Sequence, residues 1–143
     1  MVGRISDLIV GPRLHHVGIV TPSEKQANLQ MTSLGLTEEF RGYVEKWDVL
    51  CIFTRPNGAS PLEFVIPFSG PLKQFNGGLG GLHHIGLTVR DIRTTMRELA
   101  KNGITMLEDE PVKGAGPFLC NFLHPAFTKG FTVELVQELE ASA

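Results

Sequence analysis

The chain has 143 residues, with 42% hydrophobic and 20% charged residues and a formal net charge of −2 at neutral pH. This length fits one compact domain, residues 1–143, and the composition is that of an ordinary soluble globular protein. The balance of charge gives no electrostatic case for nucleic-acid binding, and no basic run predicts contact with a membrane surface. A signal peptide and an apolar run long enough to span a bilayer are both missing, so we expect a cytoplasmic protein.

The first part of the chain predicts a β-α-β-β-β module at about residues 14–67, preceded by a short tail or an extra edge segment. A strand over residues 14–20 is followed by a helix that Ser23 should cap and Gly35 should end. Three further strands are predicted at residues 38–43, 49–54 and 61–66. The Asn-Gly pair at residues 57–58 is a strong hairpin signal between the last two of them.

A Gly- and Pro-rich stretch, residues 68–81, links this module to a second one at about residues 82–136. The second module repeats the same plan, beginning with a strand over residues 82–89 and a helix that Asp91 should cap. Its other strands are predicted at residues 105–107, 118–123 and 131–135. The chain therefore reads as an α+β protein made of two tandem βαβββ modules.

Both cysteines, Cys51 and Cys120, lie inside apolar runs that are typical of strands. Buried thiols in a reducing compartment explain this placement better than a disulfide does. The cysteines thus agree with a cytoplasmic location.

An internal repeat is the strongest feature of the sequence. Residues 14–19 read Leu-His-His-Val-Gly-Ile, and residues 82–87 read Leu-His-His-Ile-Gly-Leu. The repeat places His16 and His84 at equivalent positions. A single histidine on such a strand is usually structural or exposed, but two at matched positions favour a functional role. The alternation of a strand puts each histidine on the same face as the glycine two residues later, where little side-chain bulk blocks access.

A second repeated pair consists of Glu63 and Glu134, in the segments Leu-Glu-Phe-Val and Val-Glu-Leu-Val. A carboxylate inside an apolar strand is costly to bury without compensation, so it is either exposed to solvent or held by a partner. A solvent-exposed sheet face would place polar residues beside each glutamate, but most same-face neighbours are apolar, which favours a lined cavity. Two imidazoles and two carboxylates suit one divalent first-row metal ion, such as Co, Zn, Ni, Mn or Fe, with open positions for a substrate.

The two modules and their His and Glu set resemble the vicinal oxygen chelate superfamily of glyoxalases, bleomycin-resistance proteins and dioxygenases. Within it, the second module is most similar to the methylmalonyl-CoA epimerases. The stretches that carry the similarity are residues 14–19, 62–63, 81–85, 108–116, 122–125 and 133–135. The resemblance implies a cup-shaped, eight-stranded mixed sheet with a metal inside, commonly in a homodimer. The ligands that it implies by position are His16, Glu63, His84 and Glu134.

The resemblance implies a metal-dependent epimerase or isomerase that removes a proton next to a carbonyl through a metal-stabilised enolate. Carboxylates on opposite faces of the planar intermediate would invert the carbon, with Glu134 as the first acid/base and Glu63 or Glu45 as its partner. The epimerases carry a further catalytic glutamate where an ungapped alignment here places Trp47. Either Glu45 takes that role through a small shift of the alignment, or the enzyme handles another substrate. Trp47 would narrow the cup and offer an aromatic wall. His124 is expected either to contact the substrate or to shape a turn.

Three classes of function remain open for a small-molecule substrate. The favoured class is an epimerase or isomerase of an acyl-CoA or a ketose-like carbonyl compound, although no basic cluster for CoA phosphates is evident. The second class is a glyoxalase-type lyase or a metal-dependent dioxygenase. The dioxygenases usually keep two His and one Glu, so Glu63 as a fourth ligand argues against them. The third class, a metal-free ligand-binding protein of this fold, usually loses the ligands that this chain retains.

Overall fold

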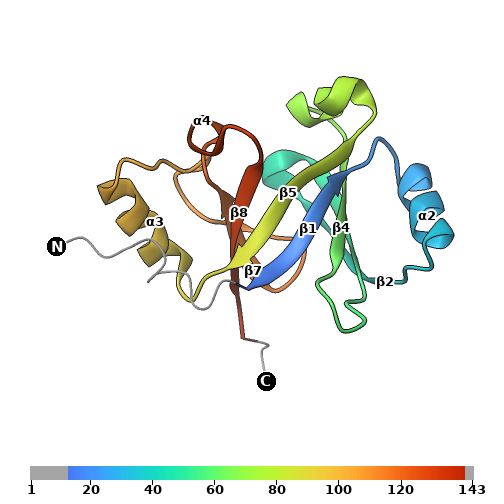
Figure 1. Ribbon diagram of the computed structural model, residues 1–143, viewed down its shortest axis with the longest axis horizontal. Coiled ribbons are helices and arrows are strands. Elements are labelled where there is room, and N and C mark those ends of the chain that lie inside the picture. Colours follow the sequence, from blue (N-terminus) through green and yellow to red (C-terminus); the bar gives the residue numbers. More distant parts are fainter. Residues whose placement is uncertain (1–12, 141–143) are drawn as a thin grey trace. The chain divides into compact units, whose positions relative to one another are not determined.

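The computed structural model describes residues 13–140, so the predicted tail or edge segment lies almost wholly outside the described residues (Figure 1). The chain divides into two compact units. The first unit is His16–His83, and the second contains the described residues before His16 and those from His84 onward. The boundary between them lies just after the linker predicted at residues 68–81.

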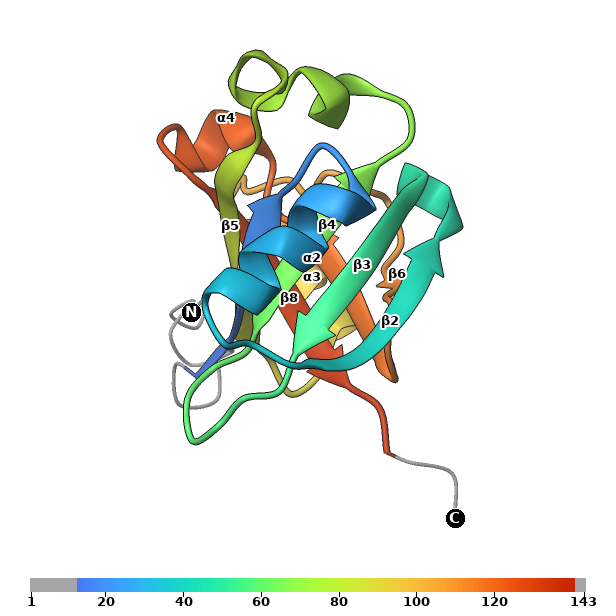
Figure 2. The same cartoon turned by 90° about the vertical axis from the view of Figure 1, so that its right-hand side faces the viewer.

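The first unit contains the predicted order of one strand, one helix and three strands. Its elements are β1 (Leu14–Val20), α2 (Glu24–Ser33), β2 (Glu38–Val44), η1 (Glu45–Trp47), β3 (Val49–Thr54), β4 (Leu62–Pro67) and η2 (Pro71–Gly78). The strands follow the order β2-β3-β4-β1, in which β1 is parallel to β4 and the other pairs are antiparallel. Figure 2 shows α2 in front of β4, with β3 beside it, and the hairpin of β2 with β3.

The second unit repeats this arrangement. Its elements are β5 (Gly81–Thr88), α3 (Ile92–Lys101), β6 (Val112–Lys113), β7 (Phe118–Phe122), α4 (Pro125–Thr128) and β8 (Thr132–Glu138). The strands follow the order β5-β8-β7-β6, with β5 parallel to β8. The eight strands confirm the predicted α+β class, the two βαβββ modules and the eight-stranded mixed sheet.

Some local predictions for the second half are wrong. At residues 105–107, where a strand was predicted, the structure has only an isolated bridge between Met106 and Leu123. The second strand of this module is instead β6, which has two residues. The predicted linker contains the helical turns of η2, and α4 was not predicted. These elements are short, and pairing with distant segments decides them more than local sequence does.

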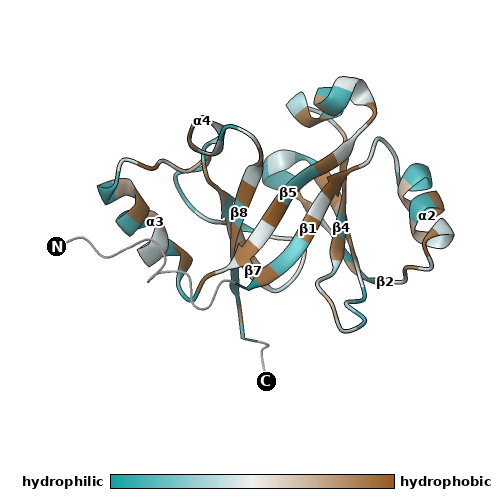
Figure 3. Cartoon of the chain, in the orientation of Figure 1, coloured by the Kyte–Doolittle hydropathy of each residue, from teal (hydrophilic) through white to brown (hydrophobic). Residues whose placement is uncertain are grey.

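Each long helix covers one face of its own unit. Ala27 and Met31 of α2 are buried against Ile52, Phe64 and Ile66 of β3 and β4. Both helices show hydrophobic and hydrophilic residues side by side in Figure 3, as expected for helices that pack on one side only. Neighbouring residues of a strand point to opposite faces, so Glu63, which lies between Leu62 and Phe64 of the α2-covered face, points to the other face.

The second unit buries the equivalent face of its strands. Ile92 and Leu99 of α3 pack with Val133 and Leu135 of β8. Glu134 lies between these two β8 residues and therefore points to the face away from α3. Burial of each large apolar side chain stabilises the fold by about 1.5–3 kcal/mol, so this packing strongly fixes the direction in which the glutamate points.

Cys51 and Cys120 are both buried thiols, as predicted. Within residues 13–140, no helix combines the length and the apolar character needed to cross a membrane.

Candidate metal centre

His16 and Glu63 form a buried pair in the first unit. The parallel register of β1 and β4 places Gly18 beside Glu63, two residues along the strand from His16. Gly18 has no side chain to fill the space between them. Nε2 of His16 lies 3.3 Å from Oε1 of Glu63, and the two residues are only 0% and 5% exposed.

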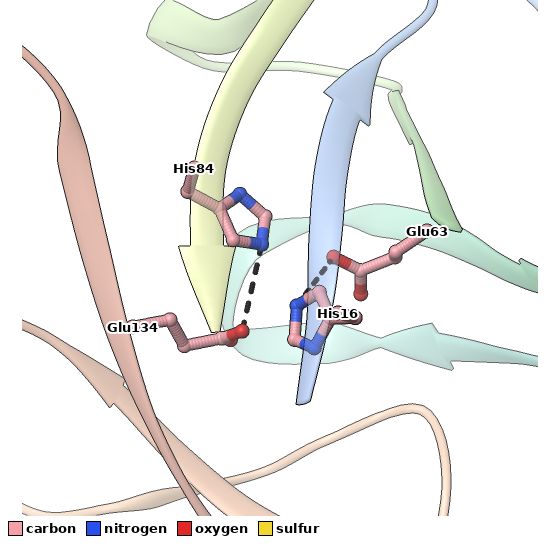
Figure 4. A group of neighbouring side chains, drawn as sticks. All are labelled: His16, Glu63, His84 and Glu134. Carbon is pink, nitrogen blue, oxygen red and sulfur yellow. Dashed lines mark ion pairs between the residues drawn. The ribbon is translucent and has the colours of Figure 1, made fainter. Parts of the chain in front are cut away.

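His84 and Glu134 form the equivalent pair in the second unit. The parallel register of β5 and β8 places Gly86 beside Glu134, as Gly18 lies beside Glu63. Nε2 of His84 lies 3.4 Å from Oε1 of Glu134, and both residues are buried. Figure 4 shows the side chains of both pairs, with a dashed line for each ion pair. The sequence repeat therefore corresponds to a repeated local geometry.

A phenylalanine contacts each histidine in the same way. Phe53 of β3 and Phe122 of β7 each stand opposite the glutamate of their unit in the antiparallel register. Phe53 meets the His16 ring edge to face at 5.2 Å, and Phe122 meets the His84 ring at 5.1 Å. Such a contact stabilises by about 0.5–1.5 kcal/mol and limits the orientations open to the imidazole.

The contacts of these phenylalanines with the histidines were not predicted, although the sequence contains a pattern that marks both positions. The third strand of each module contains a Cys-x-Phe pattern, at residues 51–53 and 120–122. Like the histidines and glutamates, the pattern recurs after nearly the same interval. A search for repeated aromatic positions would have found it.

The donor atoms of each pair are of the kind that binds divalent first-row metal ions. Each pair offers an imidazole nitrogen and a carboxylate oxygen, which are ordinary ligands of Zn, Co, Ni, Mn and Fe. Carboxylates as deeply buried as these are expensive to maintain without a compensating positive charge, which a cation would supply. Among the described residues, each unit by itself thus offers a buried nitrogen and oxygen donor to a metal ion, from His16 with Glu63 in the first unit and from His84 with Glu134 in the second.

Glu45 and Trp47 both lie on η1, in the loop between β2 and β3. The Glu45 side chain is exposed, and Trp47 is half-buried. They therefore come from a hairpin loop, not from the strands that carry the His16–Glu63 pair. Their predicted roles toward a substrate remain predictions.

His124 serves as the N-cap of α4. Its Nδ1 accepts a hydrogen bond from the backbone N–H of Ala126 at 3.1 Å, and its side chain is exposed. Of the two roles expected for His124, the structure shows the one in a turn. Contact with a substrate remains a prediction.

The family model of the Glyoxalase/Bleomycin resistance protein/Dioxygenase superfamily matches residues 15–122 of this chain. The chain belongs to this superfamily, as its repeated His and Glu residues predict. Among its relatives is human mitochondrial methylmalonyl-CoA epimerase, which is 32% identical over 131 residues covering 87% of this chain and 73% of the relative.

Solved structures show the same fold. A Bacillus halodurans C-125 protein described as hypothetical is 29% identical, with a TM-score of 0.79 over 94% of this chain and 99% of its own. Methylmalonyl-CoA epimerase from Mycobacterium tuberculosis has a TM-score of 0.82 over 92% of this chain and 91% of its own. Its sequence identity is 21%, so this likeness is evidence for the fold alone.

Proposed function

We propose that the protein is a metal-dependent epimerase that moves a proton next to a carbonyl group, with methylmalonyl-CoA as the first substrate to test. The observation that carries this proposal is the buried His–Glu pair that recurs in both units with the same glycine register. The 32% identity to human methylmalonyl-CoA epimerase supports the choice of reaction and substrate class.

We expect one divalent ion per chain, with His16, Glu63, His84 and Glu134 as its ligands. Membership of the superfamily and the buried donor set both support this expectation. When bound, such an ion would polarise the substrate carbonyl and stabilise the negative charge that develops on its oxygen.

Inversion at a carbon needs one group to remove the proton and a second group to return a proton to the opposite face. Glu134 is our first acid/base, and Glu63 or Glu45 is its partner. The buried pair of Glu63 with His16 and the exposed position of Glu45 make these two partners chemically different. A buried carboxylate is easier to tune toward neutral pH, whereas an exposed one needs the substrate to cover it.

Trp47 and His124 are the proposed substrate contacts. The indole of Trp47 offers a large apolar face next to Glu45 on the same turn. Because Nδ1 of His124 accepts the capping hydrogen bond, a substrate contact from this residue would use Nε2.

Solvent exchange tests the proposed reaction. Purified, metal-loaded protein incubated with one epimer of methylmalonyl-CoA in deuterium oxide should yield the other epimer with deuterium at the α carbon. The Glu134→Gln variant is the control for background exchange. Inversion without deuterium uptake, or no conversion by a metal-loaded protein, would contradict the proposal. Oxygen consumption or turnover of a thiol–aldehyde adduct would instead identify a dioxygenase or a glyoxalase-type lyase.

We also predict a homodimer, for which the family resemblance is the warrant. Light scattering at micromolar protein concentration should give twice the chain mass of 15.7 kDa. A monomer mass would show that this prediction is wrong.

A further inference from the structure

The loop between β2 and β3 is closed by one residue, Asp48. The loop consists of residues 45–48, of which η1 occupies the first three. The backbone N–H of Asp48 donates to the carbonyl oxygen of Glu45 at 3.1 Å. Asp48 has φ 51 and ψ 54, in the left-handed region that Asp and Asn tolerate better than most residues. The turn therefore ends on a residue whose backbone conformation favours Asp or Asn.

The side chain of Asp48 connects this loop to two other parts of the first unit. The hydroxyl of Tyr43, on β2, donates to Oδ1 of Asp48 at 2.5 Å. The hydroxyl of Ser69, just after β4, donates to Oδ2 at 2.6 Å. The backbone N–H of Phe68 donates to the Asp48 carbonyl oxygen at 3.0 Å. Asp48 thus uses its N–H, its carbonyl and both carboxylate oxygens.

The charge of Asp48 matters to these contacts, because an ionised acceptor binds hydroxyl donors more strongly than a neutral one does. The hydrogen bonds from Ser69 and Tyr43 lower the pKa of the Asp48 carboxyl, and the positive charge of Lys73 acts in the same direction. The hydrogen bond to Asp48 in turn raises the pKa of Tyr43. Asp48 is therefore ionised at neutral pH, in the form that holds both hydroxyls.

We propose that Asp48 is a positioning residue that holds η1, and with it Glu45 and Trp47, in the place from which they meet the substrate. The proposal rests on the proposed function for its catalytic consequence, and on the hydrogen bonds above for its structural one. Asp48 directly follows Trp47, so a loss of its contacts would free the turn that carries both residues. The contacts reach β2 and the segment after β4, which fixes the turn from two sides.

Tryptophan fluorescence tests the structural part directly, because Trp47 is the only tryptophan of the chain. Asp48→Asn keeps the tolerance for the left-handed conformation but removes the charge and one acceptor oxygen. We expect it to shift the Trp47 emission maximum and to raise quenching by acrylamide. Glu39→Gln, at an exposed position near the start of β2 and away from this loop, also removes one negative charge and should leave both readings unchanged. Equal readings for Asp48→Asn and Glu39→Gln would overturn the proposal.

A second variant keeps the test sound if Asp48→Asn folds poorly. The double variant Tyr43→Phe with Ser69→Ala removes both hydroxyl donors and leaves Asp48 in place. It should reproduce the fluorescence change of Asp48→Asn while circular dichroism stays that of the wild type. An unchanged Trp47 spectrum in this folded double variant would equally overturn the proposal.

Kinetics with methylmalonyl-CoA test the functional part. Asp48→Asn should lower kcat/KM by about tenfold or more, because small misplacements of reacting groups are costly, while metal content stays that of the wild type. A fluorescence change with unchanged kcat/KM would overturn the positioning role. If the wild type does not turn over methylmalonyl-CoA, the proposed function fails, but the fluorescence comparison still decides whether Asp48 holds the turn.

Discussion

The two units share one set of features and differ in another. Each has a buried His–Glu pair, a glycine beside the glutamate and a phenylalanine edge against the histidine. Their hairpins, β2 with β3 and β6 with β7, differ in length, because β2 has 7 residues whereas β6 has only 2. In our account the repeated features bind the metal ion, and the features that differ meet the substrate.

The loops of the two hairpins are held by opposite chemistry. In the first unit, the carboxylate of Asp48 accepts hydrogen bonds from two hydroxyls. In the second, the ammonium of Lys113 donates to the carbonyl oxygen of Gly116 at 2.5 Å. The turn after Lys113 also depends on Gly114, where an added Cβ would lie 2.1 Å from the ring of Phe118. Each loop is fixed, but by residues that have no equivalent in the other unit.

The largest expected effect is the loss of turnover when an acid/base glutamate is replaced. Comparing the glutamates tests whether the two units act alike in proton transfer. Glu134→Gln keeps the shape and a weak oxygen ligand but removes the proton acceptor. Turnover should fall by roughly 10²–10⁴-fold while some metal is retained. Steady-state kinetics and elemental analysis of the same sample measure both quantities. Loss of turnover only in proportion to lost metal would show that Glu134 is a ligand and not the acid/base.

Parallel variants then identify the partner of Glu134. A comparable loss in Glu45→Gln, at full metal content, would support the epimerase alignment and divide proton transfer between a strand and a hairpin loop. Wild-type activity of Glu45→Gln would assign the second acid/base to Glu63, which would make the two units chemically symmetric.

Gly114→Ala tests the packing that is peculiar to the second hairpin. The added methyl group would overlap the Phe118 ring, so the free energy of unfolding should fall by about 1–3 kcal/mol. Gly130→Ala is the matched control, because nothing lies within 4 Å of an added Cβ there. Urea denaturation measures both variants. Equal stability of the two would show that the second hairpin does not need its glycine.

Phe53→Leu and Phe122→Leu test the feature that the two units share. Each should weaken metal binding by about 2- to 12-fold, the equivalent of the 0.5–1.5 kcal/mol of an aromatic pair, because the imidazole orients less well. Competition with a chromogenic chelator measures the affinity. Phe64→Leu, on the helix-covered face of β4, should lower stability without changing metal affinity. Unequal effects of the first two variants would show that the halves are not equivalent.

The smallest expected effect is the pH dependence of the first hairpin. Because the pKa of Asp48 is lowered in the folded protein, its contribution is fully present above the ordinary Asp pKa of about 3.9 and is lost as pH falls through the lowered value. The Trp47 emission should therefore stay constant from neutral pH to about pH 4 and change only below it. A transition near pH 6 would assign the change to another group.

The elements that could be predicted are those in which a sequence repeat and a hydrophobic pattern agree. The strands that carry His16 and His84 could be predicted because each combines strand-forming residues with a copy elsewhere in the chain. The direction of Glu63 followed from the alternation of its strand, which the packing of Phe64 against α2 bears out. With these directions predicted, the pairing of β1 with β4 and of β5 with β8 is enough to bring each histidine next to its glutamate.

The missed features depend on contacts between segments that are distant in sequence. Strand β6 has only two residues, so its pairing with β7 and not its own composition defines it. The contacts of Phe53 and Phe122 with the histidines require the register of three strands. The role of Asp48 depends on Ser69, a residue 21 positions away, and no local pattern joins the two.

The metal content of the purified protein tests the central claim most directly. After loading with Co²⁺ and removal of excess, elemental analysis should find one ion per chain in the wild type. His16→Ala and His84→Ala should each lose most of that ion, because each histidine would be a ligand of the same centre. Glu39→Gln should retain it. Two ions per chain, or full occupancy in either histidine variant, would contradict a single centre built from both units.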